Sequence, residues 1–592
     1  MALDREGSVH SKHTDVEKDA AIALDISSEE EFVHQGVKTV EATNKIFGKY
    51  SKWALFVGLG LAAYVYSLDG QTTYYYLTWA ASDFNDHSLI STIQTAQSII
   101  IACGKPAIAK VADVSSRGSA YFVVLVFYVV GYIVIASAHN IQTVAGGIVL
   151  YAIGYTGLQL LTQIIIADIT TLKWRGLVSS LISLPFIINA FIGSNVYTNV
   201  MAHAGWRWGY GMFAILIPVS LSPLIVTLLW AERKAKRLGL VPPKKQDSNT
   251  KLVSSAWRIA QEMDLIGLVL IGASVALILL PLTLAGKANG GWSNPSMIAM
   301  IVIGCCLLPV FGVWDVKLAK FPVIPYRFLK NRSIAIASAI GFFDFISFYL
   351  TFTYLFSFII VVKPWSSVNS SYFIQTQTVA LTIFGIMAGV IMRFTNRYKW
   401  LLTIGLAIRL TGVGLMIHSR GANASDAEVV WTQILQGLGG GIASACGQVA
   451  AQASVPHVDV AMATAVVLLL TEIGGSIGSA AAGAVWTNNM PEKLAQYLPD
   501  VSEEDRAALF GSISTVITQY ERGSAVRNGV IQAYSDVMHI MLIIATVVSV
   551  IPFLLSLFMP DWYLGDTQNA VDGEGLEGSE MRRTEVDSDT KV

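Results

Sequence analysis

The stretch Leu265-Ile-Gly-Leu-Val-Leu-Ile-Gly-Ala-Ser-Val-Ala-Leu-Ile-Leu-Leu-Pro-Leu-Thr-Leu-Ala285 contains no charged side chain. A helix needs about 20 apolar residues to cross the ~30 Å hydrocarbon core of a bilayer. This stretch therefore predicts a membrane-spanning helix. The whole 592-residue chain agrees, because 53% of its residues are hydrophobic and only 14% are charged, whereas soluble domains carry about 25% charged residues.

Similar apolar runs recur along the chain and predict an all-α polytopic membrane protein with about fourteen spans. We expect these spans near residues 54–74, 88–109, 119–138, 143–167, 177–199, 208–230, 264–285, 297–316, 334–362, 372–394, 400–418, 428–450, 461–487 and 537–559. The run at 428–450 is the least apolar, since it is rich in glycine and glutamine. The lipid bilayer is thus the first partner that the composition implies.

Basic residues in the short loops predict the orientation, because Lys and Arg concentrate on the cytoplasmic side. With the N-terminus inside, the cytoplasmic loops include the strongly basic segments 233–245 and 317–332. The opposite short loops carry only Arg207, Lys287, Lys363 and Arg420. Both chain ends are then cytoplasmic, and two glycosylation sequons, at Asn369 and Asn423, lie outside.

The chain lacks the sequence motifs of several functional classes of protein. The Gly-Lys pairs that begin at Gly48, Gly104 and Gly286 have no phosphate-binding pattern around them, so a nucleotide-driven pump is not expected. The four cysteines lie in apolar runs, and neither a metal site nor a resident cofactor can be read from the chain. A net charge of −1 gives no reason to expect nucleic acid. We therefore expect a secondary transporter and not an enzyme.

The loop after the second span reads Ala109-Lys-Val-Ala-Asp113-Val-Ser-Ser-Arg117-Gly118. It resembles the cytoplasmic signature of the major facilitator superfamily, with Asp113 and Arg117 at the matching positions. That resemblance implies two six-helix bundles, and the pair of spans at 264–316 would then be inserted between them. A carboxylate and a guanidinium on a tight loop can pair and hold a cytoplasmic gate shut. Asp168 and Arg175, at the end of the fourth span, are expected to join this gate.

Several stretches together resemble the fungal siderophore–iron transporter family, a fourteen-helix branch of that superfamily. They include Tyr66-Ser-Leu-Asp-Gly-Gln-Thr-Thr-Tyr74, Ala167-Asp-Ile-Thr-Thr-Leu-Lys-Trp-Arg-Gly176 and Gln436-Gly-Leu-Gly-Gly-Gly441. The resemblance implies uptake of a ferric siderophore by proton symport, by a monomer in the plasma membrane or, alternatively, in an endosomal or vacuolar membrane. Exchange of glutathione or another small organic solute, and heme import, remain open alternatives.

The predicted organisation has five parts. These are a disordered cytoplasmic tail (1–52), an N-terminal six-helix bundle (53–230), cytoplasmic loops with the two extra helices (231–333), a C-terminal six-helix bundle with an extracellular loop at 488–535 (334–559), and an acidic cytoplasmic tail (560–592). Within the extracellular loop, Ser502 followed by Glu503, Glu504 and Asp505 predicts a capped helix.

Four ionisable residues fall inside predicted spans, namely Asp69, Asp344, Arg409 and Glu472. A charge at the bilayer centre costs at least ~2.5–3.5 kcal/mol on insertion scales, so each is a candidate functional residue. The three carboxylates are candidate proton carriers, and Arg409 is a candidate counter-ion for a carboxylate or for an anionic substrate. The alternative is an internal ion pair that holds helices together.

A bulky, oxygen-rich chelate requires a cavity with aromatic walls and scattered hydrogen-bonding groups. The candidates for such a lining are Tyr66, Tyr74, Gln159, Gln163, Phe345, Tyr349 and Gln448. The alternative for the aromatic residues is contact with lipid or the membrane interface, and for the glutamines it is hydrogen bonding between helices.

Overall fold

The structure is a computed structural model that describes residues 49–84, 90–114, 116–238, 261, 264–284, 291–320, 322–421, 424–456, 459–511 and 513–565. Within these ranges every regular element is a helix, which confirms the all-α prediction. Eleven of the described helical segments are long and apolar enough to cross a membrane. Three expected spans fall outside that set: 88–109, which is helical from Ile90, 177–199, which is divided between two helices at residues 183–184, and 428–450, which is helical. The count of fourteen therefore stays a prediction.

The N-terminal half consists of α2 (Lys49–Asp83), α3 (Ile90–Val114), α4 (Arg117–Ala136), α5 (Ile141–Ile169), α6 (Leu172–Ile182), α7 (Pro185–His203) and α8 (Gly205–Arg237). Helices α4 and α5 pack closely because glycines face the neighbouring backbone. A Cβ on Gly154 would lie 2.6 Å from the Tyr128 nitrogen, and one on Gly131 would lie 2.5 Å from the Tyr151 nitrogen. This close approach brings the tyrosines of both helices together in the core of this half.

The C-terminal half consists of α12 (Tyr326–Lys330), α13 (Arg332–Phe352), α14 (Leu355–Val362), α15 (Ser367–Thr395), α16 (Lys399–Ser419), α17 (Asp426–Ala453), α18 (Val460–Tyr497), α19 (Glu503–Gly511), α20 (Ile513–Gln519) and α21 (Ala525–Leu557). The predicted capped helix is present as α19, where Ser502 Oγ accepts from the Asp505 backbone nitrogen at 3.1 Å. Helices α18 and α21 both extend into the segment 488–535 that was predicted as a loop.

Two further helices, α10 (Leu265–Leu284) and α11 (Pro295–Val313), pack against each other, with the short turns η2 (Gly291–Ser293) and η3 (Trp314–Leu318) beside α11. Helix α10 also contacts α3 of the N-terminal half and α18 of the C-terminal half. The pair therefore lies against the junction of the two halves. Of the predicted tails, residues 1–48 and 566–592 lie outside the described residues.

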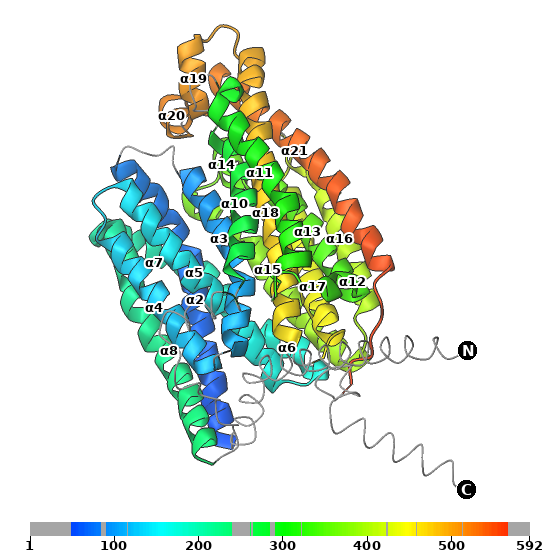
Figure 1. The fold of residues 1–592 in the computed structure, drawn as a ribbon. Helices are drawn as coiled ribbons and strands as arrows, with labels where there is room; N and C mark the ends of the chain where they lie inside the picture. The colour runs from blue at the N-terminus through cyan, green and yellow to red at the C-terminus, as the bar shows by residue number, and fades with distance from the viewer. Residues whose placement is uncertain are drawn as a thin grey trace, which may run out of the picture.

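Helices α19 and α20 lie at one end of the molecule, and α6 and α12 lie at the other (Figure 1). The distribution of basic residues assigns the end with α6 and α12 to the cytoplasm. We call it the cytoplasmic end below, and this assignment stays a prediction.

A short segment after the last helix, residues 559–565, crosses the cytoplasmic end, and we call it the C-terminal strap. Met559 and Leu564 are buried, and the Leu564 nitrogen donates to the Asn396 carbonyl at 3.0 Å. The Lys173 backbone nitrogen, next to the start of α6, donates to the Gly565 carbonyl at 3.2 Å. The strap thus lies on the C-terminal half and reaches the N-terminal half.

Candidate functional site

Asp69 lies on α2 and is fully buried in the core of the N-terminal half. Its carboxylate accepts hydrogen bonds from Tyr128 and Tyr132 of α4 and from the Tyr151 hydroxyl of α5 at 3.1 Å. All three donors are neutral hydroxyl groups. A buried charge must be paired or fully hydrogen-bonded, and here hydrogen bonds take that role. We call Asp69 with these three tyrosines the Asp69 cluster.

A chain of aromatic side chains leads from the Asp69 cluster toward the C-terminal half. The rings of Tyr151 and Tyr155 lie 5.5 Å apart between centroids, and those of Tyr155 and Tyr66 lie 4.9 Å apart. The Tyr66 and Tyr155 side chains also hydrogen-bond to each other. Both phenols lie within electrostatic range of Glu472 on α18. Tyr66, predicted to line a cavity, is therefore part of a link between two of the predicted carboxylates.

Glu472 makes an ion pair that joins the two halves. Lys105 Nζ, on α3, lies 2.8 Å from Glu472 Oε1. The Lys105 side chain is fully buried, whereas that of Glu472 is 19% exposed. Each residue belongs to a different half, so any rotation of one half against the other changes this distance.

Asp344 and Arg409 form an ion pair between α13 and α16 within the C-terminal half. The Arg409 Nη2 atom also donates to the Asp344 backbone carbonyl at 3.0 Å. Glycines of α17 make room for the guanidinium, because a Cβ on Gly440 would lie 2.8 Å from Arg409 Nη1. Arg409 is thus paired with a carboxylate, and its predicted role in transport stays a prediction.

The predicted gate residues lie at the cytoplasmic end of the N-terminal half. Arg117 Nε is 3.0 Å from Asp168 Oδ2, and both side chains are buried. The Arg175 Nη2 atom donates to the Ala167 carbonyl at 3.1 Å. Asp113 is in the last turn of α3, but its side chain lies outside the described residues. The pairing of Asp113 with Arg117 therefore stays a prediction.

The two halves meet closely at the cytoplasmic end. Helix α6 packs on α15 so tightly that a Cβ on Gly389 would lie 2.7 Å from the Leu177 Cα. The Arg393 guanidinium lies over the Trp174 ring, 4.3 Å from its centroid. Gln448 Nε2 donates to Gln163 Oε1 at 2.7 Å across the halves, so two predicted lining residues contact each other.

A polar cavity of about 90 Å³ lies beside the two glutamines and is lined also by Ser179, Ser183, Ser444 and Gln452, among others. Sites for drug-sized ligands measure about 300–1,000 Å³. The cavity is therefore too small for a bulky chelate, and the cytoplasmic end is closed to such a solute in this conformation.

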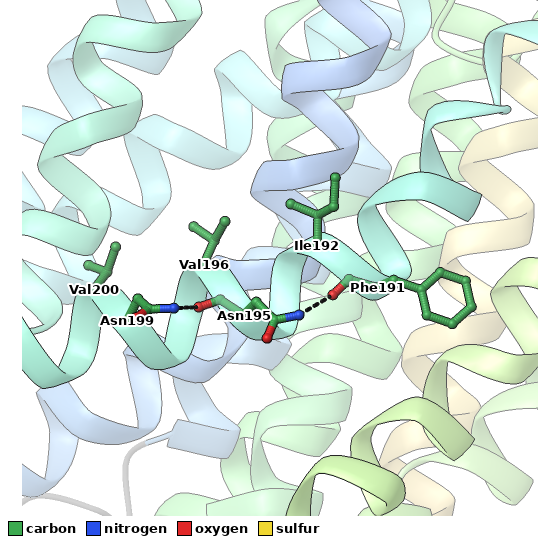
Figure 2. Close-up of a pocket in the computed structure, with 6 residues that line it drawn as sticks. All are labelled: Phe191, Ile192, Asn195, Val196, Asn199 and Val200. Atoms are coloured by element: carbon green, nitrogen blue, oxygen red, sulfur yellow. Dashed lines mark hydrogen bonds between the residues drawn. The ribbon is translucent and has the colours of Figure 1, made fainter.

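An open groove of about 450 Å³ lies along one face of α7, toward the outer end. Figure 2 shows its lining side chains, all of which come from α7. Asn195 and Asn199 are exposed there, and each donates its amide to the carbonyl four residues earlier, at 3.0 and 2.9 Å. Phe191, at the end of this face, contacts Tyr372 of α15 with centroids 5.8 Å apart. This groove, which we call the α7 groove, thus borders the C-terminal half.

The remaining predicted residues are more dispersed. Phe345 and Tyr349 contact each other at 6.2 Å between centroids and both approach Gly475 of α18. Gln159 has a buried side-chain oxygen that accepts no hydrogen bond from the described residues. The side chain of Tyr74 is outside those residues, as is the whole of Asn423, whereas Asn369 is exposed in the first turn of α15.

Sequence reasoning missed Lys105 and the three tyrosines of the Asp69 cluster. Lys105 was considered only as part of a Gly-Lys pair without a phosphate-binding pattern, although a lysine inside an apolar run was itself a signal. The tyrosines gave a weaker signal, since tyrosine is common in membrane helices near the interface. Their convergence on one carboxylate depends on the packing of α4 against α5.

Comparisons with known proteins agree with this architecture. The family model of the Major Facilitator Superfamily matches residues 56–478. The siderophore transporter fer7 of Mycosarcoma maydis is 36% identical, over 100% of this chain and 94% of that protein. The siderophore iron transporter mirC of Emericella nidulans is 37% identical, over 91% of this chain and 89% of that protein. The low affinity heme transporter str3 of Schizosaccharomyces pombe is 36% identical, over 91% and 88%. The chain therefore belongs to the siderophore iron transporter family of the major facilitator superfamily.

Proposed function

We propose that this protein imports a ferric siderophore by proton symport, as a monomer in the plasma membrane, with no enzymatic activity and no resident cofactor. The names of the relatives fer7 and mirC support the substrate class. The observation that carries proton coupling is the Asp69 cluster, a fully buried carboxylate that accepts hydrogen bonds from neutral hydroxyl groups, three of them from tyrosines.

A carboxylate with neutral donors can accept a proton without leaving an unpaired charge behind. Burial in low dielectric favours the neutral form of a carboxyl group, and the surrounding hydroxyl groups can reorient to donate to or accept from either form. Protonated and deprotonated Asp69 can therefore both be satisfied within the same packing. Such a site can load and release a proton in each transport cycle.

The chain of phenols suggests where the proton goes next. Tyr151 contacts Asp69, and Tyr155 and Tyr66 continue toward Glu472 at the junction of the halves. We propose that a proton from outside reaches Glu472 by this route while the cytoplasmic end is closed. Its arrival at the junction would couple proton movement to movement of the halves.

The chelate would enter from the outer end, where the α7 groove offers about 450 Å³ next to α15. The polar cavity of about 90 Å³ at the cytoplasmic end would have to enlarge before a chelate could leave. Its glutamine and serine side chains suit an oxygen-rich solute, because they provide both hydrogen-bond donors and acceptors. Transport on this view requires the Gln163–Gln448 contact to break.

The relative named a low affinity heme transporter makes heme a second candidate substrate. Heme and a ferric siderophore differ in shape and polarity, since heme is flat and mostly apolar. Exchange of glutathione or another small organic solute stays an alternative that the sequence leaves open.

Uptake of radiolabelled iron separates these functions. The chain is expressed in yeast cells that lack other routes for chelated iron, and each iron compound is supplied alone. We expect accumulation of iron from a ferric siderophore, faster at acidic external pH and abolished by a protonophore. Accumulation from heme alone would favour the second candidate. Uptake whose rate is unchanged by external pH and by a protonophore would rule out proton symport. A lack of iron uptake at normal surface expression would rule out both substrates.

A further inference from the structure

The buried lysine Lys105 lies outside every role described so far for proton or substrate. It is on α3, its side chain is fully buried, and its ammonium group lies 2.8 Å from the Glu472 carboxylate on α18. A buried cation in a membrane helix is costly and marks a functional residue by default. Its partner is a carboxylate of the opposite half.

Both residues of the pair are fixed firmly within their own half. Next to Lys105, a Cβ on Gly104 would lie 3.5 Å from Thr156 Cγ2, so α3 is packed on α5 at this level. Two residues after Glu472, a Cβ on Gly474 would lie 2.1 Å from the Phe342 carbonyl oxygen, so α18 is packed on α13. The distance between Lys105 and Glu472 therefore follows the relative position of the halves.

We propose that Lys105 is a positioning residue that makes its ion pair with Glu472 a proton-sensitive latch between the two halves. With Glu472 deprotonated, the attraction between the charges keeps α3 against α18 and the cytoplasmic end closed. A proton on Glu472 removes that attraction, and the halves can separate. This inference rests on the proposed proton symport, and it adds the residue that converts protonation into movement.

The other titratable groups around Glu472 do not replace Lys105. Tyr66 of α2 and Tyr155 of α5 face it as neutral phenols. On α13, Asp344 is paired with Arg409. Helix α10, packed against both α3 and α18, carries no titratable residue between Leu265 and Leu284. On α17 and α21 the acidic side chains Asp426, Glu428 and Asp536 and the imidazole of His539 lie toward the outer ends of their helices. The charge of Glu472 is therefore balanced by Lys105.

The test measures closure of the cytoplasmic end without any substrate. In the full-length protein in lipid nanodiscs, Gln163 and Gln448 are replaced by cysteine, and a short bifunctional thiol reagent crosslinks the two positions. Single-cysteine versions correct for the native thiols. The yield is measured near pH 8, where the thiols react through their thiolates, and we expect a high yield for the parent, in which Glu472 is charged and paired with Lys105.

Variants of the pair then decide the proposal. Glu472→Gln, which cannot be charged and so resembles the protonated side chain, should lower the yield by a factor of several. Because Lys105→Met can fail to fold, the exchange Lys105→Glu with Glu472→Lys carries the test and should restore the high yield. Lys105→Arg should keep the parent yield. As a matched control, Asp459→Asn removes an ion pair within the C-terminal half, with Arg327 at 2.7 Å, and should change nothing.

The parent yield retained in Glu472→Gln, or a folded charge exchange that stays at the low yield, would overturn the latch. The crosslinking needs no iron chelate. If the parent and its variants show the expected yields but the parent takes up no ferric siderophore, the proposed function is contradicted and the latch is still supported.

Discussion

Asp69 and Asp344 are both buried carboxylates on the first long helix of their half, but their partners differ in charge. Asp69 accepts from three tyrosine hydroxyl groups, whereas Asp344 is paired with the Arg409 guanidinium. Adding a proton to Asp344 would leave a buried guanidinium without its counter-charge, and adding one to Asp69 would leave no unpaired charge. We therefore propose that similar positions in the two halves hold a fixed structural pair on one side and a proton-binding group on the other.

The largest expected effect comes from breaking the pair in the C-terminal half. Asp344→Asn leaves Arg409 buried and unpaired, which costs about 3–5 kcal/mol. We expect a large loss of folded protein, measured by fluorescence-detected size exclusion and by thermal unfolding in detergent. The double variant Asp344→Asn with Arg409→Gln should recover much of that loss. A stable Asp344→Asn variant that has lost only its pH response would reverse the comparison and make Asp344 the proton carrier.

Asp69→Asn tests the other side of the comparison and should affect coupling more than stability. One proton moved down a gradient of one pH unit supports about tenfold accumulation, or ~1.4 kcal/mol. The variant should lose about that factor in pH-driven accumulation while still binding the ferric chelate, measured by uptake at matched surface expression. Asp83→Asn, on the same helix but in an exposed ion pair with Arg207, is the control. Full pH-driven accumulation in Asp69→Asn would exclude Asp69 as the carrier.

Removing single hydroxyl groups from the Asp69 cluster should leave pH-driven accumulation in place, a smaller effect than that of Asp69→Asn, and should change the proton affinity by about 1.5–3 kcal/mol, the range for hydrogen bonds to charged groups. Tyr151→Phe takes away one donor to the carboxylate, so its charged form becomes less favourable. The pH at which uptake is half-maximal should move upward. Tyr121→Phe is the matched control, because that hydroxyl bonds Thr162 at 2.8 Å. An equal shift in both variants would show that the cluster has no special part in proton binding.

The smallest effect is expected at an ion pair near the outer surface, between Lys363 and Asp426 at 3.1 Å. A hydrogen bond from Trp365 and the Lys363 ammonium group hold the pKa of Asp426 below its ordinary value. Its contribution to stability is therefore present above about pH 4 and is lost as the pH falls through the lowered pKa. The Asp426 side chain is 60% exposed, and the buried Lys363 ammonium group also donates to the Ala424 carbonyl. Asp426→Asn should therefore cost about as little as an exposed pair, ~0–1 kcal/mol.

Thermal unfolding of Asp426→Asn and of the parent at several pH values checks this. The difference between them should vanish in strong acid. A loss as large as that of Asp344→Asn would show that burial is not what separates the two pairs.

Most of the helices could be predicted from the sequence because their apolar runs are long and continuous, as in residues 265–285. The sequence also identifies Asp69, Asp344, Arg409 and Glu472, because a charge stands out against an apolar background. It does not predict which charges pair. Pairing depends on side chains from helices far apart in the chain, and the partner of Glu472 lies 367 residues away. The proposed division of roles between Asp69 and Asp344 therefore rests on the packed structure and not on the sequence.

The C-terminal strap has a consequence for how the chain matures during synthesis. The N-terminal half leaves the ribosome first, but the Lys173 nitrogen bonds the carbonyl of Gly565, a residue that is made after the last membrane helix. The hydrogen bond between the start of α6 and Gly565 therefore cannot form until almost all of the chain has been translated. A protein shortened before Met559 would insert all its spans and still lack this contact. The contacts of the cytoplasmic end are therefore complete only after the whole strap has been synthesised, and insertion of the helices alone does not provide them.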